Sequence, residues 1–148
     1  MAFEFSLNAL LRLRQSLEKA ELQRLQGTVA RCIRVRLRIG SVTQEIKDLR
    51  NTMQESAARG VTGAELHFQG LEVAAREKQL GELRKALNEV EQLRQKQLAS
   101  YRKARQRREI ISNLRQRELE AYQLEQARRQ QQQADELFLM RWKPESEI

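Results

Sequence analysis

The chain has 148 residues and a formal net charge of +8, and charged residues make up 32% of it while aromatic residues make up only 5%. Its one proline, Pro144, lies close to the C-terminal end, so no proline interrupts a helix in the body of the chain. This composition, rich in Ala, Glu, Lys, Leu, Arg and Gln, is typical of long helices and coiled coils, and it argues against a globular core with a catalytic cleft.

The single cysteine, Cys32, excludes an intrachain disulfide and favours a reducing cytoplasm. The N-terminal segment has neither the basic region nor the apolar run of a signal peptide. No stretch contains the roughly 18 apolar residues that a membrane helix requires. We therefore expect a soluble, cytoplasmic chain with no direct insertion into a membrane.

The first arm is predicted to be a helix over about residues 3–58. Its apolar residues recur at alternating steps of four and three, which indicates a coiled-coil seam, although the pattern slips near Glu21 and Cys32. The predicted seam residues are Leu10, Leu13, Leu17, Leu25, Val29, Cys32, Val35, Ile39, Val42, Ile46, Leu49 and Met53.

Two glycines separate the arms and predict a chain reversal over about residues 59–63. Gly60 suits a helix end that needs a positive φ. Thr62 and Glu65 have the spacing of a capping box at the start of a second helix. The alternative is a kink in one continuous helix.

The second arm is predicted to be a helix over about residues 64–141, with a strong seam only up to about Val90. With a bend centred near Gly60, Met53 is predicted to face the region of His67, and Leu10 the region of Ile111. The predicted seam residues are Leu66, Leu71, Ala75, Leu80, Leu83, Leu87, Val90, Leu98, Tyr101, Ala104, Ile111 and Leu114.

The second arm is the longer one, so residues after about Leu119 are predicted to have no partner from the first arm. Residues 120–141 would then form an exposed helix that ends in a dense apolar cluster. One interpretation is that this end enters a partner. The alternative is that Phe138 and Trp142 fold back onto the aromatic N-terminal segment around Phe5.

Two basic blocks stand out along the chain. We expect the charge of the first block, which lies in the first arm, to be compensated across the hairpin by Glu82 and Glu89. The second block lies in the second arm and is expected near Arg12 and Arg14. There it could steer an acidic partner or remain a solvated face. Nucleic-acid binding is a weaker interpretation, because aromatic platforms for base stacking are missing. The first block is Arg31, Arg34, Arg36 and Arg38, and the second is Arg102, Lys103, Arg105, Arg107, Arg108, Arg115 and Arg117.

The sequence offers no catalytic constellation. His67 is the only histidine and lies far along the chain from Cys32, so neither a His-based triad nor a His/Cys metal site is expected. A Gly-rich phosphate loop followed by Lys-Ser or Lys-Thr is also missing. We expect no enzyme activity, no metal and no cofactor.

The opening segment, residues 3–14, resembles the start of the flagellar type III export protein FliJ. The shared pattern is aromatic-x-aromatic-x-Leu-x-x-Leu-Leu-x-Leu-Arg. The total length, the glycine-bearing bend and the closing Asp135-Glu136-Leu137 segment agree with that family too. The residues that carry the pattern here are Phe3, Phe5, Leu7, Leu10, Leu11, Leu13 and Arg14.

The resemblance implies an antiparallel two-helix coiled-coil hairpin, similar to the central stalk of the rotary F-type ATPase. It implies that the end with both termini binds the hexameric flagellar export ATPase in its pore and promotes its assembly and activity. Carried onto this chain, the ATPase-binding residues are Phe3, Phe5, Leu7, Leu10, Leu11, Arg12, Leu137, Phe138, Met140 and Trp142.

The resemblance also implies that the half near the bend contacts the cytoplasmic domain of the membrane export gate protein, and that the chain escorts export chaperones. Such a protein would be associated peripherally with the export apparatus at the inner membrane. The expected gate-binding residues are Val42, Leu49, Phe68, Leu71 and Ala75, of which Ala75 is smaller than the family pattern suggests.

These expectations together describe a non-enzymatic stalk of the flagellar export ATPase. Two other interpretations stay open at this point. One is the equivalent stalk of an injectisome type III secretion system, and the other is a general cytoplasmic coiled-coil adaptor or chaperone without an ATPase partner.

Overall fold

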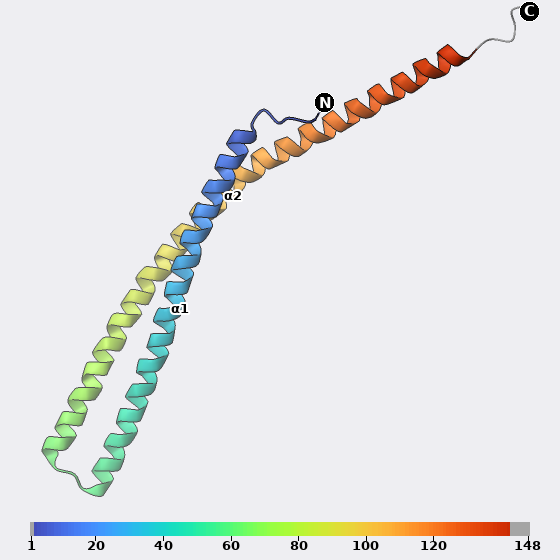
Figure 1. Ribbon diagram of the computed structural model, residues 1–148. Coiled ribbons are helices and arrows are strands. Elements are labelled where there is room, and N and C mark those ends of the chain that lie inside the picture. Colours follow the sequence, from blue (N-terminus) through green and yellow to red (C-terminus); the bar gives the residue numbers. More distant parts are fainter. Residues whose placement is uncertain (1, 143–148) are drawn as a thin grey trace, which may run out of the picture. The chain divides into compact units, whose positions relative to one another are not determined.

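Two helices account for most of residues 2–142, which are the residues that the computed structural model describes (Figure 1). Helix α1 spans Asn8–Arg59 and helix α2 spans Gly63–Arg141, and this range contains no strand. The two helices pack against each other in opposite directions, and α2 is the longer one. The predicted all-α helical hairpin with a longer second helix is therefore confirmed.

The chain reverses through a helix stop that depends on Gly60. This residue has a φ of 81°, and its N–H donates to the carbonyl of Ala57 at 3.3 Å. The N–H of Val61 donates to the carbonyl of Ser56, also at 3.3 Å. This pair of bonds is a Schellman motif, which satisfies the last carbonyls of α1 and requires a left-handed residue that glycine supplies without strain.

Helix α2 begins with the cap that the sequence predicts. The hydroxyl oxygen of Thr62 accepts a hydrogen bond from the N–H of Glu65 at 3.3 Å. This bond satisfies one of the four N–H groups that lack a partner at a helix start, and Glu65 places a negative charge in the first turn. The predicted reversal, rather than a kink, is what the structure contains.

The start of α1 differs from the prediction. The helix begins at Asn8 instead of near residue 3, and residues 2–5 have no regular secondary structure. The N–H of Asn8 donates to the carbonyl of Phe5 at 3.2 Å, which closes a turn just before the helix.

The chain divides into two compact units. The hairpin unit is Lys19–Arg102, and the terminal unit combines the chain up to Glu18 with the chain from Lys103 onward. The prediction of a single domain over residues 1–148 stays a prediction.

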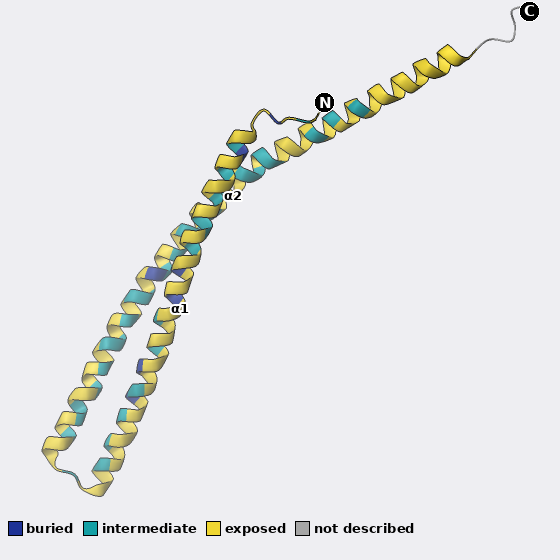
Figure 2. Cartoon of the chain, viewed as in Figure 1, coloured by how far each residue is buried: buried dark blue, intermediate teal, exposed yellow. Residues whose placement is uncertain are grey.

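The core of the hairpin unit is thin, as Figure 2 shows by the few buried positions on each helix. Val42 is completely buried, and Cys32, Ile46 and Val90 are nearly so. Thr28 is the one buried polar residue among those described, and its hydroxyl is in hydrogen-bonding contact with the side chain of Gln97 from α2. Burial of an apolar side chain contributes about 1.5–3 kcal/mol. Since few side chains are fully buried, the half-buried residues along the interface between α1 and α2 also contribute to the free energy of folding.

The two helices of the hairpin unit face each other in a register displaced from the predicted one. Met53 lies against Gly70, with its Cε 4.0 Å from the position of an added Cβ there, rather than against the region of His67. Gln69 donates to the hydroxyl of Ser56 at 3.2 Å, and Arg50 pairs with Glu77. The turn residues 60–62 add length between the helices, which moves every facing residue of α2 further along the chain.

Several residues predicted for the seam lie outside it, because the buried face of each helix is rotated from the predicted one. Leu13, Leu17 and Val29 on α1 are exposed, and so is Leu71 on α2. The polar residue Thr28 takes a buried position where the heptad pattern assigned Val29.

Replacing Gly81 with Ala is predicted to stabilise the hairpin by about 0.5–1 kcal/mol. An added Cβ at Gly81 would meet nothing within 4 Å, and the residue lies inside α2. The matched substitution Gly60→Ala is predicted to destabilise the protein by about 1 kcal/mol, since the left-handed conformation penalises a Cβ. Urea unfolding measures both. Equal effects of the two substitutions would contradict this account of the turn.

Candidate functional site

The N-terminal segment of the terminal unit is held against α2 by aromatic contacts. The rings of Phe3 and Tyr122 have centroids 5.5 Å apart and are tilted by 47°, an arrangement that aromatic pairs favour. Phe5 is buried although it precedes α1, and Leu11 is buried one turn into the helix. The aromatic opening motif therefore packs within this chain, and we call Phe3, Phe5, Leu11 and Tyr122 the N-terminal clasp.

A bidentate ion pair joins the two helices elsewhere in the terminal unit. Arg108 donates from Nε to Glu18 Oε2 at 2.6 Å and from Nη2 to Glu18 Oε1 at 3.2 Å. Both side chains are largely shielded from solvent. Two parallel charge-assisted bonds fix both the distance and the relative orientation of the guanidinium and the carboxylate. This pair therefore holds Glu18 of α1 at a defined position along α2.

The second basic block is therefore partly compensated within the chain. Besides the Arg108–Glu18 pair, Arg105 donates to Glu109 at 2.9 Å. Arg115 lines a small hollow together with Glu4, Phe5 and neighbouring residues of the N-terminal segment. Arg12 is exposed.

The apolar cluster at the end of α2 is exposed. Its members do not fold back onto Phe3 or Phe5; they are 55–81% exposed. The tail before the cluster is also exposed from Ala127 onward, whereas Tyr122 and Gln126 are still half-buried. The exposed tail thus begins later than the predicted Leu119. We call Leu137, Phe138, Leu139, Met140 and Trp142 the C-terminal cluster.

The predicted ATPase-binding residues therefore divide into two sets. Phe5 and Leu11 are buried in the terminal unit, and Phe3 and Leu10 are half-buried. Leu7, just before α1, and Arg12, in its first turns, are exposed, and so are the predicted residues of the C-terminal cluster. The exposed set is the part of this surface that a partner can reach without rearrangement. The ATPase-binding role itself stays a prediction.

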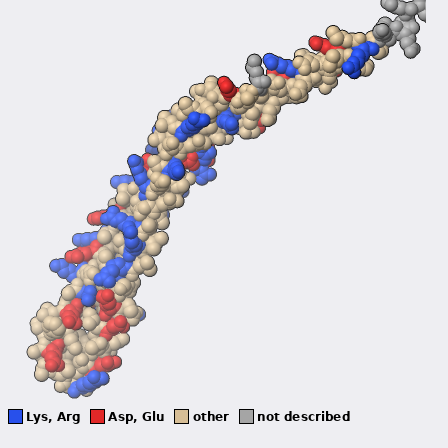
Figure 3. Space-filling view, in the orientation of Figure 1, with Lys and Arg blue, Asp and Glu red and all other residues tan. Residues whose placement is uncertain are grey.

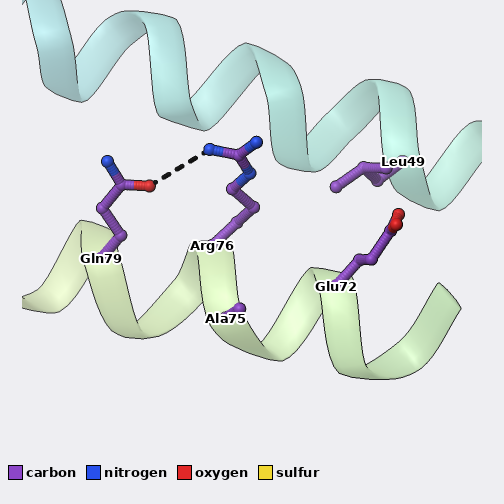
Figure 4. Close-up of a pocket in the computed structure, with 5 residues that line it drawn as sticks. All are labelled: Leu49, Glu72, Ala75, Arg76 and Gln79. Atoms are coloured by element: carbon purple, nitrogen blue, oxygen red, sulfur yellow. Dashed lines mark hydrogen bonds between the residues drawn. The ribbon is translucent and has the colours of Figure 1, made fainter. Parts of the chain in front are cut away.

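The predicted gate-binding residues differ in exposure as well. Val42 is completely buried between the helices, so its side chain offers no surface to a partner. Leu49 is half-buried and lines a shallow hollow with Glu72, Ala75, Arg76 and Gln79, as Figure 4 shows. Phe68 and Leu71 are exposed. Phe68, Leu71 and Ala75 thus remain available on α2, because Val73 and Arg76 rather than Leu71 and Ala75 are half-buried there.

The first basic block pairs with acidic residues other than those predicted. Arg36 pairs with Glu91 of α2 rather than with Glu82 or Glu89, and Arg38 lies 3.5 Å from Glu45 on its own helix. Arg94 donates to Glu91 at 2.9 Å, and this bond lowers the pKa of the Glu91 carboxyl, with Arg36 adding to the effect. Glu91 therefore stays ionised between two guanidinium groups.

Sequence reasoning missed three residues that fix this geometry. Tyr122, Glu18 and Thr28 hold the helices together, yet none of them belongs to the predicted apolar seam. A contact of Tyr122 with the N-terminal segment was predictable from the sequence, because Tyr122 is one of only two tyrosines and lies in a polar stretch, while the N-terminal segment is aromatic. Glu18 and Thr28 carry no such signal, since isolated polar residues are common on exposed helix faces.

Phe5→Ala is predicted to loosen the N-terminal clasp at a cost of about 3 kcal/mol, because it removes a buried aromatic side chain. Hydrogen exchange of residues 8–18 should speed up accordingly. Leu7→Ala is the matched control, since Leu7 is exposed and its truncation should cost less than about 1 kcal/mol. If both substitutions change exchange equally, the segment is not held by burial of Phe5.

In a comparison with protein families, residues 3–147 match the family described as the flagellar FliJ protein. No curated protein and no solved structure matches the chain. Within residues 2–142, neither helix combines the length and apolar character of a membrane span, and no group of three His, Cys, Asp or Glu side chains is placed to hold a metal ion.

Proposed function

The chain belongs to the flagellar FliJ family and so has a role in flagellar protein export, and we propose that it acts there as a central stalk of the export ATPase ring. The family is a non-catalytic component of export. In this proposal the end of the chain that carries the C-terminal cluster enters the hexameric ATPase and stimulates its assembly and hydrolysis.

The observation that carries the proposal is the arrangement of the C-terminal cluster around α2. Leu137, Phe138, Leu139 and Met140 are consecutive, and successive helical residues point about 100° apart. The four side chains therefore point in four directions around the helix axis, and all of them are exposed. A groove could bury one or two of them, whereas a partner that buries all four must surround the helix. The pore of a ring is such a partner.

The rest of the tail suits the same role. Residues 127–136 are exposed and, apart from two alanines, polar, so this part of α2 can cross a hydrated channel without burying charge. The exposed Arg12 and Arg107 would add positive charge that attracts an acidic entrance. Burial of the cluster would then favour the closed ring over separate subunits, which is mass action by a ligand that binds only the assembled state.

Two further roles belong to the proposal on the strength of the family. Phe68, Leu71 and Ala75 form the exposed surface proposed to contact the cytoplasmic domain of the membrane export gate protein. Escort of export chaperones is the other role. Coupling of ring and gate would then require only that one chain binds both.

The double substitution Phe138→Ala with Met140→Ala is predicted to lower stimulation of the cognate flagellar export ATPase at least about tenfold. Both side chains are exposed, so helical content should not change. Hydrolysis measured with purified ATPase and increasing amounts of the variant gives the answer. If the variant stimulates hydrolysis as strongly as the unmodified chain, the C-terminal cluster does not act on the ATPase and the proposal is wrong.

Ile110→Ala is the matched control for that experiment. Ile110 is 65% exposed on the same helix, the same exposure as Leu139, but it lies outside the C-terminal cluster. Stimulation should survive this substitution. If Ile110→Ala and the double substitution lower stimulation equally, the effect comes from a general loss of exposed apolar surface and not from loss of the C-terminal cluster.

A further inference from the structure

Helix α1 carries a second row of apolar side chains, next to the face that packs on α2. Val29, Ile33 and Leu37 are spaced four residues apart, so their side chains form one continuous ridge along the helix. All three are exposed, and Leu37 reaches 69%. Single exposed leucines are common on protein surfaces, but three aliphatic side chains aligned on one ridge form a packing surface. We call these three residues the outer ridge.

The surroundings of the outer ridge are strongly basic. The stretch from Leu22 to Gln44 contains five arginines and no Asp or Glu. Arg34 lies three residues before Leu37, and Arg36 lies three residues after Ile33, so the two guanidinium groups flank the ridge on its two sides. Lys and Arg side chains gather along the middle of the hairpin unit in Figure 3.

The acidic residues of this chain neutralise that stretch only in part. Arg36 has Glu91 as a partner, whereas Arg31 and Arg34 form no ion pair with any residue between 2 and 142. The nearest carboxylates along α1 are Glu21, which pairs with Arg24, and Glu45, which pairs with Arg38 and Arg76. Of these two, Arg34 borders the outer ridge, whereas Arg31 is two residues from Val29 and Ile33 and points elsewhere. The charge of Arg34 is thus left for an external partner.

We propose that the outer ridge is a docking site for an acidic amphipathic helix of another protein. The i, i+4, i+8 spacing is the ridge that packs into the groove of a second helix, with a crossing angle of about −50°. Gly40 lies three residues beyond Leu37, and an added Cβ there would meet nothing within 4 Å. This open position lets the partner helix approach the backbone of α1 closely. Carboxylates beside the apolar residues of the partner would pair with Arg34.

Two other occupants fit the ridge less well. A second copy of this chain that packs through the same face would place the same arginines against each other, and like charges at close range oppose association. A lipid surface is favoured by basic helices that carry Trp or Phe, but residues 22–44 contain no aromatic side chain. The docking site is separate from the C-terminal cluster and from Phe68 and Leu71, so it does not depend on the stalk proposal.

A synthetic probe tests the proposal with the full chain. The probe is a helix-forming peptide of about 20 residues with Leu at every fourth position and Glu on both sides of that row. Fluorescence anisotropy of the labelled peptide should show saturable binding that weakens as salt is raised. A peptide of the same design with Lys in place of Glu should bind at least about tenfold more weakly. Failure of the acidic peptide to bind at concentrations up to about 100 µM overturns the proposal.

Variants of the chain locate the binding surface. Leu37→Ser and Arg34→Gln should each weaken binding of the acidic peptide, the first by at least about tenfold. The matched controls are Ile110→Ser, with nearly the same exposure as Leu37, and Arg107→Gln, an exposed arginine of the second basic block. Equal effects of the variants and their controls overturn the proposal, because the peptide would then bind any basic or apolar surface.

A third substitution separates docking from helix stability. Gly40→Gln favours the helix, since glycine is a poor helix former, yet it fills the open position beside the ridge. We expect a more stable chain that binds the peptide more weakly. Unchanged peptide binding by this variant contradicts docking at Gly40. If Leu37→Ser instead abolishes a concentration-dependent dimer, or binding to phosphatidylglycerol vesicles, while leaving peptide binding intact, the ridge serves a second copy or a lipid surface and the proposal fails.

Discussion

The structure depends on the geometry of one chain reversal. Gly60 takes the left-handed conformation that ends α1, and the hydroxyl of Thr62 caps the start of α2 only a few residues later. This short connection leaves the two helices little freedom to slide, so it determines which residues face each other. The helices contain 52 and 79 residues, and a single reversal of arms so unequal leaves part of the second without a partner. The exposed tail of α2 is thus a consequence of where the glycine lies.

Polar contacts reinforce that register where the apolar seam is weak. Thr28 meets Gln97 in the hairpin unit, and Glu18 accepts two bonds from Arg108 in the terminal unit. A shifted pairing would leave these partly buried groups without partners, and an unpaired buried polar group costs about 1–3 kcal/mol. An apolar seam alone tolerates sliding by a heptad better than such pairs do. The chain therefore specifies its register with few fully buried side chains, and much apolar surface stays free for partners.

The sequence was sufficient to predict the helices, the reversal and a second helix that outlasts the first, but it left open whether the C-terminal cluster folds back onto the N-terminal segment. Helical periodicity, Gly60 and the Thr62–Glu65 spacing are local features of the sequence. They can be interpreted without knowing which residues of the other helix they face. The facing pairs were missed because register is a non-local property that also depends on the length of the turn. Arg36 consequently pairs with Glu91. Leu71 and Ala75 lie outside the seam because the heptad pattern was assigned to the wrong face of α2, where Val73 and Arg76 are the half-buried residues. The aromatic opening motif predicted a binding surface, whereas Phe5 is buried, since a motif does not say whether its side chains face a partner or their own chain.

The central claim is that the N-terminal segment packs on α2 well before its end, which leaves the C-terminal cluster exposed. A short thiol cross-linker tests it most directly in a Cys32→Ala background that carries one pair of introduced cysteines. With Glu4→Cys and Arg115→Cys, two positions that line one hollow, we predict rapid cross-linking within a single chain. With Glu4→Cys and Arg141→Cys, we predict none. Cross-linking of the second pair and not the first would mean that the end of α2 folds back onto the N-terminal segment, and the account would be wrong.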